Sequence, residues 1–387
     1  MTDSVTGGFQ FSASYAPARW GLYWLENFSW ESIRLDFDAA QQLGLRRLSL
    51  DIRWSDLQPA ARRIFLPAMR SIEQVLDGAA DRDLLLLPVL FPMEVAGMAM
   101  APDWVLEPGG EPGRLVLAGN VLTHRPLRDI MSDEDMVRAQ VRAVSEMTGA
   151  FAGHPALAGW VLGSHIFDVS PPSSATAFGQ WLSRLVDAVS MRSFTSLWHG
   201  VSARTVVLAN TFDTSVLSDL GVGLRVAADW HPAWAAGSGR WWLAFLAAYA
   251  RQLTGAPSVI NDAGTCTVRY DVPGTHGCVD ETAAANWLED VLPFLHEAGG
   301  GGCETHFIDL DVELRRAPPY DRQPGALSRG LLRVDRTPKP QALAGAQFAL
   351  QNAQVRPLPD NFPGVDPDLR LRSPESVARD SFEAWTL

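Results

Sequence analysis

Short apolar runs alternate with amphipathic stretches along most of the chain. The runs are rich in Leu and β-branched residues, have the length of strands, and are bounded by turn residues. Eight of them are expected to be β-strands: residues 9–15, 46–52, 84–91, 157–162, 205–211, 224–231, 257–264 and 303–311. The run LLLLPVLF at 84–91 is apolar on both faces, which is typical of a parallel strand buried on both sides.

The stretches between these runs have the spacing of helices. The clearest helices are expected at residues 29–44, 68–82 and 132–153. Ser29 is a good N-cap and Gly44 a good stop for the first of them. Ser132 and Asp135 form a capping-box pattern at the start of the third.

The alternation of these elements predicts a closed (β/α)8 barrel, an α/β fold of the TIM-barrel type. An open doubly wound sheet usually has a Gly-rich turn after its first strand, and ASYAPARWG at 13–21 has none. We expect residues 1–350 to form the barrel and residues 351–387 to complete the same domain as a C-terminal extension. Residues 93–133 form a long loop after the third strand and are a candidate lid.

Charge and hydropathy exclude several kinds of partner. The formal net charge is −12 and no Lys- or Arg-rich run provides a basic face, so we expect no nucleic-acid partner. No apolar run approaches the ~20 residues that span a bilayer. The segment 1–17 has neither the basic nor the apolar region of a secretory signal. We therefore expect a cytoplasmic protein without a membrane partner; the sequence does not indicate an oligomeric state.

The three cysteines, Cys266, Cys278 and Cys303, are an odd and low number, which fits free thiols in a reducing compartment. Two alternatives remain open. Cys266 and Cys278 could form a disulfide across a loop, or they could bind a metal together with His276.

Ionisable and aromatic side chains gather where the expected strands end. The segment GHPALAGWVLGSHIFD at 153–168 ends its apolar strand in the imidazole of His165. In (β/α)8 barrels the functional residues lie at the carboxyl ends of the strands. The candidates at these ends are Trp20, Trp24, Asp51, Arg53, Trp54, Glu94, Ser164, His165, Asp168, Asn210, Asp229, Trp230, His231, Asn261, Asp262, His306 and Asp309. Such a mixture suits a sugar, because aromatic faces stack on the ring and polar groups bind its hydroxyls.

Several segments resemble the retaining (β/α)8-barrel glycoside hydrolases of the cellulase and β-mannanase type. They are LGLRRLSLDIRWSDLQP at 43–59, FAGHPALAGWVLGSH at 151–165, ADWHPAW at 228–234, GAPSVINDAG at 255–264, APPYDRQPGALSRGLLRVDRTPKPQA at 317–342 and VDPDLRLRSPESVARDSFEAW at 365–385. Their order along the chain is that of the family. The resemblance implies the barrel fold and a catalytic pair of carboxylates about 5 Å apart.

The chain departs from the family at the positions that carry this chemistry. Where the family has Asn-Glu at the fourth strand, with the Glu as general acid/base, this chain has Ser164 and His165. The nucleophile position at the seventh strand is Asp262. The Tyr beside the sixth-strand His is Ala233, and the Glu before the closing Gly-Leu is Ala326. The resemblance therefore implies a degenerate, rewired catalytic pair.

His165 and Asp262 are the predicted catalytic residues, as a proton-transferring imidazole and as a nucleophile or base. A structural role and a metal-ligand role remain open for His165, and a salt bridge for Asp262. The predicted substrate-binding residues are Trp20, Trp24, Asp51, Arg53, Trp54, Ser164, Asn210, Trp230, His231, Trp234, His306 and Asp309.

Several of these residues have specific expectations. The five Trp residues could form a stacking wall, with at least two of them in the core. Asp51 and Arg53 could instead pair with each other, and Asp309 could accept sugar hydroxyls together with Asp311. A metal cage of His165, His231, His306 and Asp262 is conceivable, but no ligand-spacing motif supports it, so we expect neither metal nor cofactor.

Three functions are compatible with these residues. The first is a glycoside hydrolase-like enzyme with a rewired acid/base pair that acts on a sugar or another polyhydroxylated small molecule. The second is a non-hydrolytic lyase, isomerase or cyclase of small-molecule biosynthesis. The third is a catalytically inactive carbohydrate-binding protein. The fold alone does not separate them.

Overall fold

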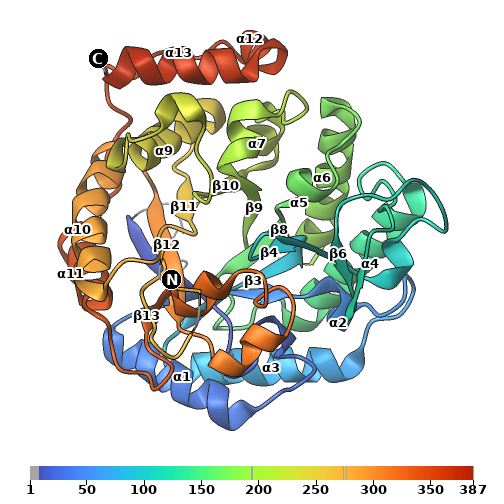
Figure 1. The fold of residues 1–387 in the computed structure, drawn as a ribbon. Helices are drawn as coiled ribbons and strands as arrows, with labels where there is room; N and C mark the ends of the chain where they lie inside the picture. Colours follow the sequence, from blue (N-terminus) through green and yellow to red (C-terminus); the bar gives the residue numbers. More distant parts are fainter. Residues whose placement is uncertain (1–7, 193–194, 273, 276, 387) are drawn as a thin grey trace.

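The computed structural model describes residues 8–192, 195–272, 274–275 and 277–386 (Figure 1). Eight parallel strands form a closed barrel in which β1 pairs with both β2 and β12. In order around the barrel they are β1 (Gln10–Tyr15), β2 (Arg47–Ile52), β3 (Leu85–Pro92), β8 (Gly159–Ser164), β9 (Ser196–Ser202), β10 (Val222–Ala227), β11 (Val259–Asn261) and β12 (Gly302–Ile308). The short β13 (Gly330–Leu332) pairs with the end of β12. The predicted (β/α)8 fold is confirmed.

Helices surround the barrel (Figure 1). The longer ones are α1 (Trp30–Leu43), α3 (Leu66–Ala80), α4 (Glu134–Phe151), α6 (Ala175–Ser190), α9 (Arg240–Thr254), α10 (Glu281–Glu297) and α11 (Pro340–Gln351). The shorter ones are α2 (Trp54–Leu57), α5 (Ile166–Val169), α7 (Ala203–Leu208) and α8 (Ser215–Leu220), with 3-10 turns at Gly21–Tyr23, Asp103–Val105, Ala233–Ala235, Val312–Arg316 and Pro324–Ser328.

The helix ends follow the expected signals, with one correction. Helix α1 has Ser29 at its N-cap and ends at Gly44, which adopts a left-handed φ of 78°. Helix α4 is capped by Asp133, whose side chain accepts the N–H groups of Asp135 and Met136. The expected Ser132 cap is therefore wrong by one residue, because a carboxylate provides the stronger acceptor at the positive end of a helix.

The fifth strand of the barrel lies upstream of its predicted position. The run 205–211 was expected to be a strand, but the strand is β9 (Ser196–Ser202) and the run begins within α7. Ser202 ends the strand and caps α7, since its Oγ accepts the N–H of Thr205 at 3.1 Å. Asn210 consequently lies exposed in the loop after α7 and not at a strand end, so the prediction of its place was wrong.

The long segment after β3 is structured. It contains a small sheet of β4 (Glu94–Val95), β5 (Met98–Ala101), β6 (Val116–Ala118) and β7 (Val121–Thr123). Met98, Met100 and Leu117 of this sheet pack in a separate apolar cluster with Leu22 and Tyr320 from other loops at the same end of the barrel. The packing holds β4 beside the barrel mouth.

The C-terminal segment packs on the barrel helices. It contains α12 (Pro367–Arg372) and α13 (Pro374–Thr386), which lie at the top of Figure 1 beside α9 and α7. The buried Arg370 donates to the backbone carbonyls of Phe212 and Val206, and Phe382 packs against Phe245. The guanidinium thus satisfies carbonyl groups of the segment that follows β9.

Cys266 and Cys278 form a disulfide, and Cys303 is a buried free thiol. The expectation of three free thiols is therefore wrong. The backbone brings the two cysteines together, because the N–H of Val279 donates to the carbonyl of Cys266 at 3.1 Å. His276, the third member of the alternative metal site, lies outside the described residues. The disulfide removes the cysteine argument for a reducing compartment.

Among the described residues, no helix has the length and apolar character required to cross a membrane.

Asp309 belongs to a buried ion pair and not to a ligand site. Its Oδ1 lies 2.7 Å from Nζ of Lys339, and both side chains are at most 2% exposed. The N–H of Gly330 donates to the same oxygen at 2.9 Å, and Lys339 also donates to Thr267 Oγ1 at 2.8 Å. The prediction that Asp309 and Asp311 accept sugar hydroxyls is not supported by this geometry, since Asp311 caps a 3-10 turn.

Replacing Lys339 by Met should strongly destabilise the fold. The substitution leaves the buried Asp309 carboxylate without its counter-charge, and such losses typically cost about 3–5 kcal/mol of unfolding free energy. Urea denaturation measures the effect. The matched double variant Lys339→Met with Asp309→Asn removes both charges and should recover part of the loss. A single variant within about 1 kcal/mol of the parent, the range of a surface ion pair, would contradict this assignment.

The disulfide is testable by counting thiols. The denatured, non-reduced protein should expose one reactive thiol, Cys303, and the reduced protein three. Replacing Cys266 and Cys278 together by Ser should lower the free energy of unfolding by about 2–4 kcal/mol, because the unfolded chain gains freedom. Three reactive thiols before reduction would show that the bond does not form.

Candidate functional site

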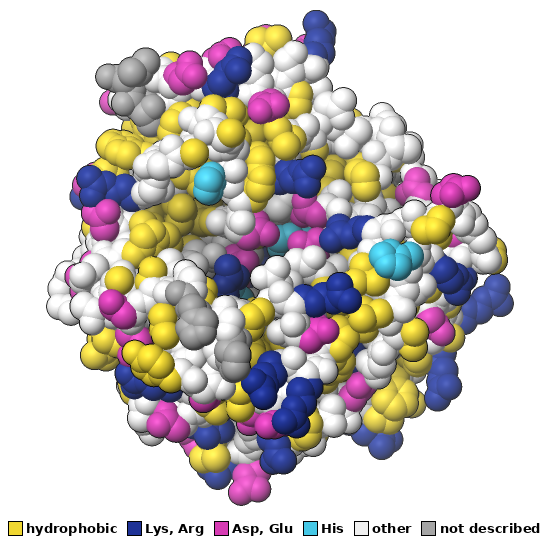
Figure 2. Space-filling view, viewed as in Figure 1, with side chains coloured by type: hydrophobic (Ala, Val, Ile, Leu, Met, Phe, Trp, Pro, Cys, Tyr) yellow, Lys and Arg dark blue, Asp and Glu magenta, His cyan; other side chains and the backbone are white. Residues whose placement is uncertain are grey.

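A cavity of about 410 Å³ opens at the carboxyl ends of the barrel strands. Figure 2 shows that this face is hollowed near its centre and that charged side chains and His surround the hollow. Six of the predicted site residues line the cavity: Trp24, Asp51, Ser164, His165, Asp262 and His306. His165 and Asp262, from the fourth and seventh strands, thus share one cavity.

His165 is held in a fixed orientation at the end of β8. Its Nδ1 lies 3.2 Å from Oδ2 of Asp168, and Oδ1 of Asp168 accepts a hydrogen bond from Ser202 at 2.7 Å. The side chain is 13% exposed. Burial alone would lower the pKa of His165, but the hydrogen bond to Asp168 and the negative charges of Asp229 and Glu94 outweigh it and raise the pKa to about 9.

Asp262 is held by two basic side chains. Its Oδ1 lies 2.5 Å from Nε2 of His306 and 3.1 Å from Nη1 of Arg329. The second ring nitrogen of His306 lies 3.0 Å from Ser14 Oγ. Burial would raise the pKa of Asp262, but Arg329, His306 and His165 together hold it well below its usual range. The carboxylate therefore stays ionised.

Both residues adopt a backbone conformation that non-glycine residues rarely use. The φ angles of His165 and Asp262 are 56° and 58°. Such left-handed residues are energetically unfavourable and concentrate at functional sites, where the surrounding structure maintains them. Each is the first residue after its strand, and its side chain lines the cavity.

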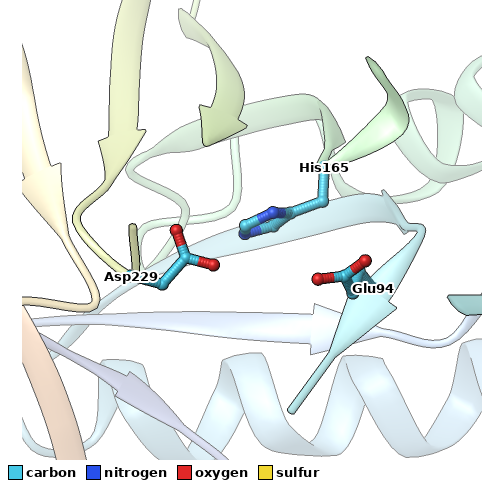
Figure 3. Close-up of side chains that lie close together, drawn as sticks. All are labelled: Glu94, His165 and Asp229. Atoms are coloured by element: carbon cyan, nitrogen blue, oxygen red, sulfur yellow. The ribbon is translucent and has the colours of Figure 1, made fainter. Parts of the chain in front are cut away.

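Two further carboxylates, in addition to Asp168, lie beside the imidazole of His165. Figure 3 shows that the carboxylates of Glu94, from β4, and Asp229, from the loop after β10, point toward its imidazole. Ligand atoms of the three side chains lie within 4.8 Å of one another. Burial raises the pKa of Asp229 to about 6. The positive charge of His165 opposes this shift, and the negative charges of Asp262 and Asp168 add to it. Arg114 binds Glu94 Oε2 at 2.7 Å.

The floor of the cavity is polar and charged. Arg225 of β10 forms a buried ion pair with Glu304 of β12, and Ser49 of β2 donates to the same carboxylate at 2.9 Å. Burial raises the pKa of Asp51 to about 6; Arg225 opposes this shift and Glu304 adds to it. These charges fill the interior of the barrel below His165 and Asp262.

The other predicted binding residues lie outside the cavity lining. They are Trp20, Arg53, Trp54, Asn210, Trp230, His231, Trp234 and Asp309. Of the five Trp residues, only Trp24 lines the cavity, so they do not form a stacking wall, whereas the expectation that at least two of them are in the core is confirmed by Trp24 and Trp54. Trp54 packs edge-to-face against Phe91 and Trp104 instead.

Several of these residues have structural partners. Arg53 pairs with Asp56 at 2.6 Å and with Glu26 at 2.7 Å, and not with Asp51 as expected. Trp234 packs against Trp242 and Phe382, and His231 is exposed. The conceivable metal cage of His165, His231, His306 and Asp262 is therefore not formed, because His231 lies outside the cavity lining.

Sequence reasoning missed Arg225, Glu304 and Arg329, which line the cavity. Arg225 and Glu304 lie inside strands that otherwise look apolar, and a charged residue within such a strand was the available signal. Glu94 and Asp229 were recognised as strand-end residues but not as part of the site. Their proximity depends on the fold of the segment after β3, which periodicity did not reveal.

Comparison with known proteins gives structural but not sequence relatives. No family model matches the chain, and no curated protein matches it. GH5_18 from Streptomyces cattleya, solved in complex with GlcNAc, is 19% identical with a TM-score of 0.77, and the match covers 98% of this chain and 90% of that one. GH5_18 from Bifidobacterium longum subsp. infantis is 17% identical with a TM-score of 0.75, covering 92% and 81%.

A third solved structure is the exo-β-1,4-mannosidase Op5Man5 from Opitutaceae bacterium strain TAV5. It is 20% identical with a TM-score of 0.72, and the match covers 91% of this chain and 62% of that one. Identities at this level establish the fold and leave the chemistry to the residues of the site. The chain therefore has the single-barrel (β/α)8 fold that is found in the GH5_18 glycoside hydrolases.

Proposed function

We propose that this protein is a glycoside hydrolase-like enzyme that binds a sugar or another polyhydroxylated small molecule in the barrel cavity. His165 takes the position of the usual acid/base Glu and Asp262 that of the usual nucleophile. The observation that carries the proposal is that these two side chains, from β8 and β11, line the same cavity, each on a left-handed backbone.

Cleavage of a glycosidic bond needs a proton for the leaving oxygen and an anion near the anomeric carbon. The imidazole of His165 provides an N–H at the position of the proton donor, and Asp168 and Ser202 hold its orientation. The ionised Asp262 provides the anion. Trp24, Asp51 and Ser164 line the cavity around them and are the proposed contacts to the ring and its hydroxyls.

The substitutions restrict the chemistry. The side chain of Asp is one methylene shorter than that of Glu, about 1.5 Å. A displacement of ~1 Å in a reacting group can cost ~10²-fold in rate. We therefore propose that the site favours substrates whose leaving group needs little protonation and whose reacting carbon lies deep, close to Asp262. The GlcNAc and Manβ1-4GlcNAc bound in the GH5_18 structures are suitable first probes.

A non-hydrolytic lyase, isomerase or cyclase of small-molecule biosynthesis is the second candidate. The observation in its favour is that the side chain of His165 is 13% exposed in a cavity of about 410 Å³, which suits proton transfer on a small ligand. The inactive binding protein has less support, since an open groove lined with Trp is not what the described residues form. We also propose that the partner of the protein is a small-molecule or carbohydrate ligand and that it has no nucleic-acid or membrane partner.

Asp262→Asn should lower turnover of aryl glycosides by about 10²–10⁴-fold, because it removes the anion near the anomeric carbon; His165→Gln should lower it less, because a 4-nitrophenolate leaving group needs little protonation. Initial rates on a panel of 4-nitrophenyl glycosides measure this. His154→Gln is the matched control, since His154 precedes β8 at the opposite end of the barrel, where it contacts Asp77. Full activity in Asp262→Asn would show that hydrolysis, if present, does not use this carboxylate.

Restoring the usual carboxylates should increase hydrolysis. The double variant His165→Glu with Asp262→Glu lengthens the anion and replaces the donor, so we expect a higher kcat on aryl glycosides than in the parent. Asp and His adopt left-handed backbone more readily than Glu, so the double variant is expected to lose some stability. If both the parent and the double variant are inactive on a broad panel, the hydrolytic geometry is absent and the non-hydrolytic candidate gains support.

A further inference from the structure

We propose that Glu94, His165 and Asp229 form a binding site for a divalent cation of the Mn²⁺ or Zn²⁺ type at the mouth of the barrel. The three side chains come from β4, from the end of β8 and from the loop after β10. One imidazole and two carboxylates point toward a common space in Figure 3. The proposed cation site lies in the cavity of the proposed active site, but its existence does not depend on the proposed function.

The distances are compatible with one ion. The potential ligand atoms lie within 4.8 Å of one another. Two atoms bound to one ion at about 2.1 Å each are at most about 4.2 Å apart. Three atoms bound to one ion are closer together, about 3.4–3.6 Å apart in a tetrahedral or trigonal arrangement. The side chains therefore need to close by up to about 1.4 Å, which rotations of the two flexible carboxylates provide.

The imidazole of His165 has the hydrogen-bonding arrangement of a metal-binding His, with a carboxylate at its second ring nitrogen. Its Nδ1 faces Asp168 at 3.2 Å, which leaves Nε2 as the nitrogen directed toward Glu94 and Asp229. A carboxylate on the second nitrogen fixes the orientation and raises the basicity of a ligand His. Asp168 lies in the short helix α5, and its Oδ1 accepts a hydrogen bond from Ser202 Oγ at 2.7 Å. Asp168 is thus a positioning residue for the ligand.

The charges also indicate a cation. Three carboxylates, Glu94, Asp168 and Asp229, surround His165, and Arg114 compensates one of them. Among the described residues, Asp229 forms no ion pair with a Lys or Arg side chain, and its carboxylate accepts a hydrogen bond from its own backbone N–H. A single proton on the imidazole leaves an excess of negative charge, whereas a divalent ion with a neutral imidazole balances it. Mixed nitrogen and oxygen donors suit Mn²⁺ and Zn²⁺ better than Ca²⁺.

The cation would occupy the cavity wall and keep further coordination positions open. Three protein ligands leave such positions for water or for hydroxyl oxygens of a ligand. Because the ion and a proton compete for Nε2, the ion-bound form and the proton-donating form of His165 exclude each other. A bound cation should therefore lower any turnover that needs the His165 proton.

Titration calorimetry with MnCl2 and ZnCl2 on the full chain, first stripped of metal with a chelator, tests the site. We expect one ion per chain in the parent, and a loss of binding in Glu94→Gln and Asp229→Asn. Asp168→Asn should weaken binding by about 10–100-fold, as expected for a group behind the ligand. Asp51→Asn is the matched control, because it removes a carboxylate from the same cavity without touching the three ligands.

Thermal unfolding separates loss of the site from loss of the fold. The ion should raise the Tm of the parent and of Asp51→Asn, and leave that of Glu94→Gln unchanged. No binding to the parent, or equal affinity in all four variants, would overturn the inference. Turnover by the metal-free parent that depends on His165 would still support the proposed function, and cation binding without any turnover would support the site alone.

Discussion

The arrangement of the site depends on the imidazole of His165, which lies among three carboxylates. Asp168 holds His165 from behind, and Glu94 and Asp229 face it across the cavity. In the same cavity, Asp262 is compensated by Arg329 and His306 and remains an anion. His165 and Asp262 are largely shielded from bulk water, so their charges need to be balanced by a neighbour, a proton or a ligand. The mouth of the barrel is therefore organised by charge compensation more than by shape.

The barrel provides the rigid frame for this arrangement. Closure between β1 and β12 fixes the ring of strand ends, and the buried Arg225–Glu304 pair fills the floor. The small sheet after β3 adds Glu94 to the rim, and its own apolar cluster holds it there. The left-handed conformations of His165 and Asp262 are maintained because the strands before them and the helix or loop after them are packed. The packing of the surrounding elements thus compensates for the unfavourable backbone conformations of these two residues.

Much of this could be predicted from the sequence, and the failures have physical reasons. Alternating apolar runs and amphipathic stretches were sufficient for the barrel, and strand-end reasoning placed His165 and Asp262 together. The fifth strand was misplaced because SLWHGVS mixes polar and apolar residues, whereas the β-branched run after it is a buried helix. Trp54, Trp234 and Asp309 follow strands as true site residues do, but their side chains turn into the core. The Cys266–Cys278 bond depends on backbone pairing within a loop, which no local pattern reveals.

The most direct measurement of the central claim is a crystal structure of the protein with a bound sugar. The account predicts that the ring lies between His165 and Asp262, with a ring substituent oxygen within hydrogen-bonding distance of the imidazole. It also predicts that Asp262 remains bound to Arg329. A sugar that binds elsewhere, or side chains of His165 and Asp262 that point away from a common cavity, would contradict the account.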